Sequence, residues 1–129
     1  MPVVVQTYVE NDPDTPLNNF QEQPVASVTI NRGETNVLIL GKVVITNFDG
    51  DAQNASARLT HSNPDGVFLE ELDRADIRIP GGNAFSQSVF LDAWITNVAP
   101  NDIVTMWCST FLGLARKVRF NVMGVDNLT

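Results

Sequence analysis

The hexapeptide "RADIRI" at residues 74–79 alternates apolar and charged side chains at every position. In an extended chain, successive side chains point to opposite sides, so a period of two predicts a strand with one buried and one exposed face. The overlapping segment 67–77 is the best helix candidate in the sequence because it is rich in acidic residues. The strict alternation that follows argues against that helix.

Short β-branched runs recur along the chain after Pro24. The predicted strands cover residues 25–30, 36–47, 54–60, 74–79, 84–91, 102–111 and 116–125. The segments between them are rich in Gly, Asn, Asp and Pro, which favour tight turns, and "FDGD" at residues 48–51 predicts a hairpin. Seven or eight strands at this spacing predict an all-β fold over residues 25–129, an antiparallel β-sandwich. Jelly-roll and immunoglobulin-like topologies both fit.

The first 24 residues have a different texture. They contain four of the seven prolines, at positions 2, 13, 16 and 24. Proline fixes φ and removes an N–H donor, so residues 1–24 are predicted to form an extended, proline-rich N-terminal arm rather than a helix. The start lacks a basic segment followed by an apolar run, so we expect no signal peptide and synthesis in the cytoplasm.

Composition restricts the function further. With 129 residues, 43% of them hydrophobic, the chain fits one domain with a packed core. A net charge of −7 disfavours binding to nucleic acid, and no stretch has transmembrane length, so we expect no membrane insertion. One cysteine and one histidine do not make an internal disulfide or a usual zinc site. We therefore expect no cofactor and no metal.

The single cysteine lies in "NDIVTMWCST", residues 101–110. One predicted face of this strand carries Val104, Met106 and Cys108, and the other carries Ile103, Thr105, Trp107 and Ser109. A thiol among apolar neighbours is usually an inert core residue. A nucleophile would need His61 as its base, and the flanking signatures of cysteine enzymes are missing. We expect no catalytic residues, and Trp107 is either a contact residue or part of a second packed face.

Three polar clusters have two interpretations each. Asn47, Asp49 and Asp51 alternate around Gly50, a spacing that suits Ca²⁺, but the Gly and Glu positions of an EF-hand loop are missing and a hairpin turn is the preferred explanation. Adjacent acids at 70, 71 and 73 resemble an acid–base pair, or a solvated surface. Residues 115–119, "ARKVR", hold three of the eight basic residues. They are suited to an acidic neighbouring subunit or an anionic glycan, or form a solvated strand edge.

From residue 36 onward the chain resembles the tumour necrosis factor-like and complement globular-head jelly rolls, including their bacterial and phage members. The resemblance rests on the long segment 36–47 with its central Gly41, on the Asn101-Asp102 turn before an apolar strand, and on the closing segment 118–125. It implies a jelly roll that assembles as a trimer, with strand faces packed about a threefold axis. It implies no functional residues.

The first functional hypothesis is a non-catalytic structural or assembly protein. It would be an oligomeric, trimeric jelly roll on the surface of a larger particle such as a phage or virus capsid, in contact with the particle's other structural proteins. The interface candidates are Phe20, Ile103 and Trp107.

The alternative is a carbohydrate- or protein-binding module, a lectin-like β-sandwich. Its glycan candidates are Asp92, Trp94 and Asn97, since sugar sites combine an exposed aromatic ring with nearby acids and amides.

Overall fold

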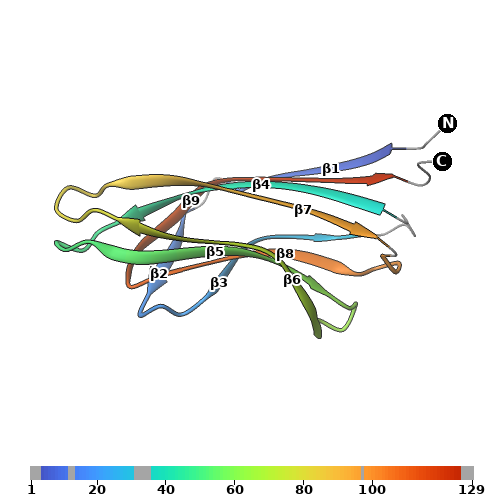
Figure 1. Cartoon of the computed structure of the whole chain (residues 1–129), viewed down its shortest axis with the longest axis horizontal. Helices are drawn as coiled ribbons and strands as arrows, with labels where there is room; N and C mark the ends of the chain where they lie inside the picture. Colours follow the sequence, from blue (N-terminus) through green and yellow to red (C-terminus); the bar gives the residue numbers. More distant parts are fainter. Residues whose placement is uncertain (1–3, 12–13, 31–35, 97, 126–129) are drawn as a thin grey trace.

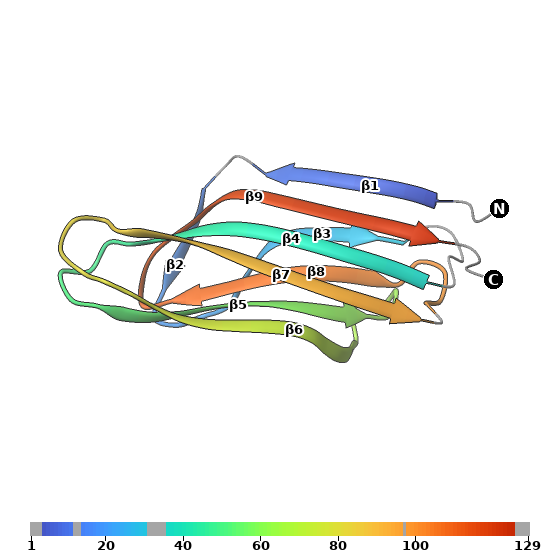
Figure 2. The ribbon, with the colours of Figure 1, turned by 45° about the horizontal axis from the view of Figure 1, so that its top comes forward.

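The computed structural model describes residues 4–11, 14–30, 36–96 and 98–125. In these residues the chain forms nine strands and no helix (Figure 1). The strands lie in two stacked layers, which Figure 2 shows at a different tilt. The prediction of an all-β sandwich is confirmed, and the helix candidate at residues 67–77 is part of a strand.

Two antiparallel sheets make up the sandwich. Sheet A has the order β1-β9-β4-β7, and β2 also pairs with β9; its strands are β1 (Val4–Asn11), β2 (Thr15–Asn18), β4 (Asn36–Asn47), β7 (Ser86–Thr96) and β9 (Leu112–Val125). Sheet B has the order β3-β8-β5-β6; its strands are β3 (Gln23–Thr29), β5 (Gln53–Ser62), β6 (Phe68–Ile79) and β8 (Ile103–Thr110).

From β3 onward the chain changes sheets at every connection except the hairpin between β5 and β6. This alternation is that of a jelly roll, so it decides between the two topologies that the sequence allows. The hairpin predicted at residues 48–51 was wrong. β4 belongs to sheet A and β5 to sheet B, so this turn carries the chain from one layer to the other.

The core lies between the sheets and follows the predicted alternation. Val104, Met106 and Cys108 of β8 are fully buried, whereas Ile103 and Trp107 on the other face are partly exposed. In β6, Ile79 is buried and the charged residues of the hexapeptide are exposed. Each fully buried aliphatic side chain contributes roughly 1.5–3 kcal/mol, so this inner layer is the main source of stability.

The described part of the predicted arm is extended. β1 and β2 both pair with β9, so they lie at the edge of sheet A. Leu17 of β2 is completely buried and joins the core. In the part of the chain that the structure describes, no helix is long and apolar enough to cross a membrane.

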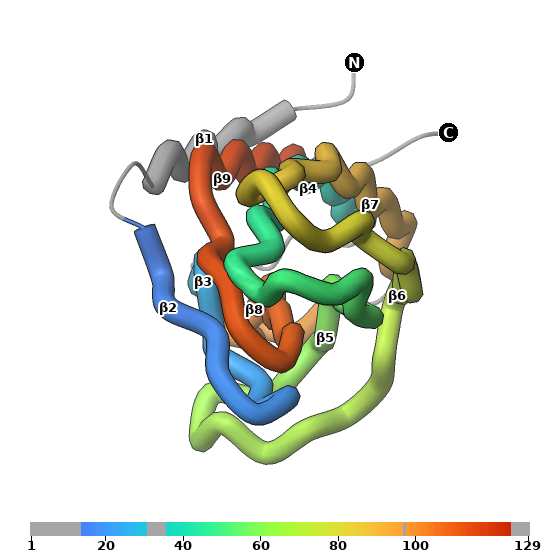
Figure 3. Tube along the Cα trace, turned by 90° about the vertical axis from the view of Figure 1, so that its left-hand side faces the viewer, coloured from blue at the N-terminus to red at the C-terminus, as the bar shows by residue number. Residues whose placement is uncertain are grey.

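The two ends of the sandwich differ. One end holds the start of β1 and the end of β9, which are paired through Val4 and Val125. The opposite end is formed by four connections, at residues 19–22, 48–52, 80–85 and 111 (Figure 3). The four connections face the viewer in Figure 3, with the strands running away behind them.

Candidate interaction surfaces

The outer face of sheet A, on the side away from sheet B, exposes apolar side chains over β4 and β7. Leu40, Phe90 and Trp94 keep 44%, 70% and 47% of their surface exposed. They are neighbours, because Leu40 is paired with Asp92, which stands between Phe90 and Trp94 in the outward row of β7. Scattered exposed apolar residues are ordinary, but a contiguous group marks a contact surface. We call these three residues the apolar patch.

Cationic side chains border the apolar patch. The Lys42 Nζ lies 5.7 Å from the centre of the Phe90 ring, in cation–π range. Arg119 is paired with Lys42, and Arg116 with Val44, on the outward rows of β9 and β4. The outward rows of β4, β7 and β9 carry these three cations and one carboxylate, that of Asp92, and Arg119 is also paired with Glu10 of β1.

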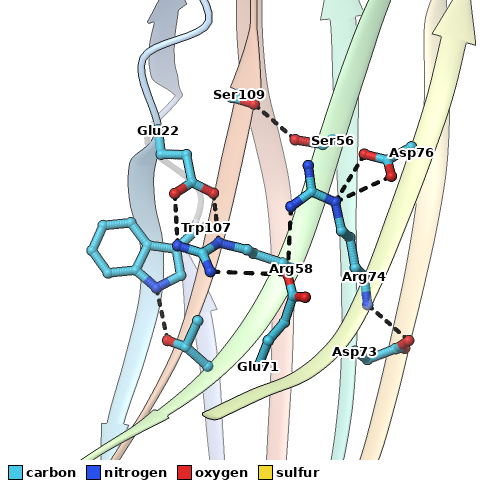
Figure 4. Close-up of polar contacts among 10 residues, drawn as sticks. Glu22, Ser56, Arg58, Glu71, Asp73, Arg74, Asp76, Trp107 and Ser109 are labelled. Atoms are coloured by element: carbon cyan, nitrogen blue, oxygen red, sulfur yellow. Dashed lines mark hydrogen bonds and ion pairs between the residues drawn. The ribbon is translucent and has the colours of Figure 1, made fainter. Parts of the chain in front are cut away.

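The outer face of sheet B is polar and is joined by side-chain hydrogen bonds (Figure 4). The hydroxyls of Ser56 and Ser109 lie 2.8 Å apart, between β5 and β8. The indole Nε1 of Trp107 donates to the Thr60 hydroxyl at 2.8 Å. These contacts fix side chains that would otherwise be free to rotate, so the face is preorganised.

Ion pairs cross the same face from β3 to β6. Arg58 donates two hydrogen bonds to Glu22, at 2.6 and 2.8 Å, and lies 3.9 Å from Glu71. Arg74 donates to Asp76 at 3.1 Å. These carboxylates raise the pKa of Arg58 and of Arg74, chiefly through the hydrogen bonds to Glu22 and Asp76. The two-bond pair with Glu22 holds the Arg58 guanidinium in one orientation.

A groove of about 870 Å³ runs along these ion pairs on the outer face of sheet B. It is lined by Phe20, Glu22, Asn54, Ala55, Ser56, Arg58, Arg74, Asp76, Ile77, Arg78 and Ser109. A second pocket of about 330 Å³ lies beyond Arg58 and includes Thr60, Phe68 and Trp107. The larger volume is in the range of small-molecule sites, but the groove is open and polar.

The structure distributes the predicted interface residues over one side of the sandwich. Phe20 lines the groove and Trp107 lines the second pocket. Arg58 lines both cavities and lies between them. Ile103 lies at the start of β8, paired with Ser62 and Thr29, and lines neither. Their role in assembly stays a prediction.

The predicted glycan residues lie on the other sheet. Asp92 and Trp94 are two residues apart on β7 and both are exposed on the outer face of sheet A. Asn97 lies outside the described residues. The structure therefore places Trp94 in the apolar patch and Asp92 beside it, on a different sheet from the groove.

The lone histidine is a structural residue. His61 is buried, and its Nε2 lies 2.8 Å from the Asp102 carboxylate, while Nδ1 lies 3.4 Å from Glu70. His61 lies on β5 and is paired with Val104 of β8, which is four positions along that strand from Cys108. Both ring nitrogens thus contact carboxylates, and the ring is directed to the Asn101-Asp102 turn rather than to the thiol.

Burial determines the chemistry of Cys108. Loss of solvent raises the pKa of its thiol from 9.0 to about 12. Only the thiolate is an effective nucleophile, so the thiol is inert at neutral pH, as the sequence predicts.

A pH titration of stability checks this pKa. Between about pH 9 and pH 12 the unfolded thiol loses its proton while the folded thiol keeps it, so the unfolded state binds fewer protons. The free energy of unfolding should therefore fall by about 1.4 kcal/mol per pH unit in this range. Urea unfolding at several pH values measures the slope. The Cys108→Ala variant is the control, and an equal slope in both proteins would contradict the prediction.

The acidic clusters do not form a site. Among the described residues, no group of three or more His, Cys, Asp or Glu is placed to hold a metal ion. In the suggested calcium loop, Asn47 is buried and its side chain bonds to the backbone. Asp73 accepts a hydrogen bond from the backbone of Asp92 at 2.9 Å, which joins β6 to β7.

Sequence reasoning singled out Phe20 but missed the group of exposed apolar residues to which it belongs, at the end of the sandwich opposite Val4 and Val125. Its members are exposed between 40% and 54%, and they are Phe20, Phe48, Phe85, Phe111 and Leu112. The signal in the sequence was only partial, because Phe48 stands in a predicted turn and Phe85 near one, whereas Phe20 belongs to the predicted arm and Phe111 ends a predicted strand. Only the fold brings the four turns together (Figure 3).

No model of a known protein family matches this sequence, and no curated protein matches it. Solved structures share its shape. A structure of the infectious bursal disease virus Gx strain aligns with a TM-score of 0.66 at 14% identity. The T13 viral particle of the same virus aligns with a TM-score of 0.68 at 12% identity. Both alignments cover 95% of this chain and 32% or 31% of the viral chain, so this chain spans about a third of the viral proteins it matches.

The globular domain of the zebrafish complement 1qA protein also aligns, with a TM-score of 0.47 at 14% identity, over 92% of this chain and 94% of that domain. At 12–14% identity, the viral structures show that the fold is shared and do not show that the function is shared.

Proposed function

We propose that this chain is a non-catalytic structural protein that assembles as a homo-oligomer, a trimer, on the surface of a larger particle such as a phage or virus capsid. The apolar patch on sheet A carries the proposal. Phe90 is 70% exposed and Trp94 47% exposed, on a rigid strand in the fold rather than on a loop. Association with another copy would remove this surface from water, and burial of apolar surface is the main driving force of association.

Two further observations support this assignment. The solved structures with TM-scores of 0.66 and 0.68 are of a virus and a viral particle, and the jelly roll aligns over nearly the whole chain. The one cysteine is sealed in the core and the one histidine is held by Asp102.

Light scattering on a size-exclusion column tests the proposal. The wild-type chain should have three times the mass of one chain. Phe90→Ser combined with Trp94→Ser should reduce the mass to that of a monomer, because it makes the patch polar while leaving the core intact. The matched control is Val67→Ser with Leu69→Ser, two residues that are 57% and 51% exposed on and beside β6. This control should remain trimeric, and a monomeric wild-type chain would refute the proposal.

A second candidate function, glycan or protein binding, is favoured by the polar groove of sheet B. Fixed arginines, hydroxyls and the exposed Phe20 ring line it together. The two tryptophans stand on different faces, so the variants Trp94→Phe and Trp107→Phe separate them. Sugar-induced fluorescence change that survives in Trp94→Phe would place a glycan in the sheet B pockets. Silence on a glycan array with unchanged fluorescence would remove this candidate.

A further inference from the structure

The end of the sandwich formed by four connections carries a cluster of exposed aromatic rings. We call Phe20, Phe48, Phe85, Phe111 and Leu112 the aromatic tip. The rings of Phe20 and Phe111 are 5.9 Å apart. Four of the chain's seven phenylalanines are in this tip, and each keeps more than two-fifths of its surface exposed. Such a concentration of apolar surface at one end marks a contact site.

Backbone hydrogen bonds hold the four connections to one another. The Phe48 N–H donates to the Leu112 carbonyl at 3.0 Å, and the Asn47 N–H donates to the Phe85 carbonyl at 2.8 Å. The Phe20 N–H donates to the Thr110 carbonyl at 3.0 Å. The tip is therefore one fixed surface, and little conformational entropy is lost when it binds.

Within the four connections the charge is of one sign, although Phe20 also lines the groove that contains the arginines of sheet B. Residues 18–22, 47–53, 80–86 and 110–113, all within the described part of the chain, contain Glu22, Asp49 and Asp51 but no Lys or Arg. Glu22 is paired with Arg58. Asp49 and Asp51 bond to Asn47 and Gly82 through their backbone atoms and not through their carboxylates. Their negative charges remain available to a partner, which should offer apolar surface and cations.

The same chain offers that combination on the outer face of sheet A. The apolar patch is bordered by Lys42, Arg116 and Arg119, so it is apolar and cationic where the tip is apolar and acidic. The two surfaces are separate, since the tip is at an end of the sandwich and the patch is on its side. They are complementary in charge and alike in apolar character.

A closed trimer needs two such surfaces. In a twofold dimer one patch meets its own copy, but in a threefold ring each subunit joins one surface to a different surface of the next. We infer that the aromatic tip of one copy binds the apolar patch of the next copy, with Asp49 and Asp51 opposite Lys42 and Arg116. This inference rests on the proposed function, because it names the surfaces through which the homo-oligomer forms.

A charge exchange tests the contact. Asp49→Lys with Asp51→Lys should reduce the mass in light scattering from three chains to one, because cations then face cations. Lys42→Glu with Arg116→Glu should do the same. All four substitutions in one chain should restore the threefold mass, since the opposite signs again meet across the contact. Thermal unfolding of each variant confirms that it is folded.

The outcomes distinguish the inference from the proposed function. One contrary outcome is that Asp49→Lys with Asp51→Lys leaves the trimer intact while Phe90→Ser with Trp94→Ser dissociates it into monomers. In that case the trimer forms without the tip, and the inference is wrong. A monomeric wild-type chain refutes the proposed function itself. Co-sedimentation with phosphatidylcholine vesicles is the final arm. Binding that is lost in Phe48→Ser with Phe85→Ser would make the tip a lipid contact and overturn the inference.

Discussion

Replacement of Asn47 by Ala should lower the free energy of unfolding by about 4 kcal/mol, one of the two largest effects expected in this chain. Asn47 is completely buried at the end of β4. Its amide nitrogen lies 3.0, 3.2 and 3.0 Å from the carbonyl oxygens of Asp51, Ile79 and Pro80. Its side-chain oxygen accepts from the Asp49 N–H at 2.8 Å and from the Gln53 amide.

This one side chain thus joins two of the four connections at the tip to the ends of both sheets. Truncation leaves several buried polar groups without partners, and each costs about 1–3 kcal/mol, reduced where water can enter. The control is Asn54→Ala, which removes an exposed amide that binds Arg78 and should cost less than about 1 kcal/mol. Urea unfolding measures both variants. Equal costs for the two would contradict the role of Asn47.

Strand positions could be predicted from the sequence where one face of the strand is buried and the other is exposed to solvent. Residues 74–79 and the two faces of β8 follow from a period of two, and the structure confirms both. A local backbone preference was predictable as well. Asn tolerates left-handed backbone geometry better than most residues, and the φ of Asn101 in the Asn101-Asp102 turn is 69°. Such features depend on a few adjacent residues, so the sequence contains them.

Sheet membership was not predictable in the same way. Asp49-Gly50 has the composition of a hairpin turn, but the strands on either side pair with β7 and β9 in one case and with β6 and β8 in the other. The buried side chain of Asn47 holds this crossing between the sheets, because it bonds to Ile79 and Pro80, more than thirty residues away. A local pattern does not reveal such a partner.

The contact surfaces required the fold for the same reason. Phe48 and Phe85 occur in separate turns and meet because the Asn47 N–H bonds to the Phe85 carbonyl. Trp94 was noted from its neighbours in sequence. Phe90 shares the outward row of β7 with Trp94, and Leu40 joins them only through the pairing of β4 with β7. The sequence thus indicated single candidates, and the register of the sheets made them into surfaces.

Replacement of Asp102 by Ala should cost about 3 kcal/mol of stability, the second large effect. The Asp102 carboxylate is buried and lies 2.8 Å from His61 Nε2, 41 residues away in sequence. It also accepts the Ala99 N–H at 3.2 Å. The variant leaves one side of a buried imidazole without a partner and removes an acceptor from the turn that joins β7 to β8.

A double-mutant cycle separates the pair from its surroundings. His61→Ala and Asp102→Ala should each be costly, but the combination should cost less than their sum, since the second change removes a partner that is already unpaired. Glu70→Gln is the matched control at the other ring nitrogen. Glu70 is exposed and 3.4 Å from Nδ1, so this change should shift stability by less than about 0.5 kcal/mol. Strictly additive costs for His61 and Asp102 would show that the two residues stabilise the fold independently. The turn would then be held by its backbone bonds, which join Ile30 to residues 101–102 and Asp102 to Ala99.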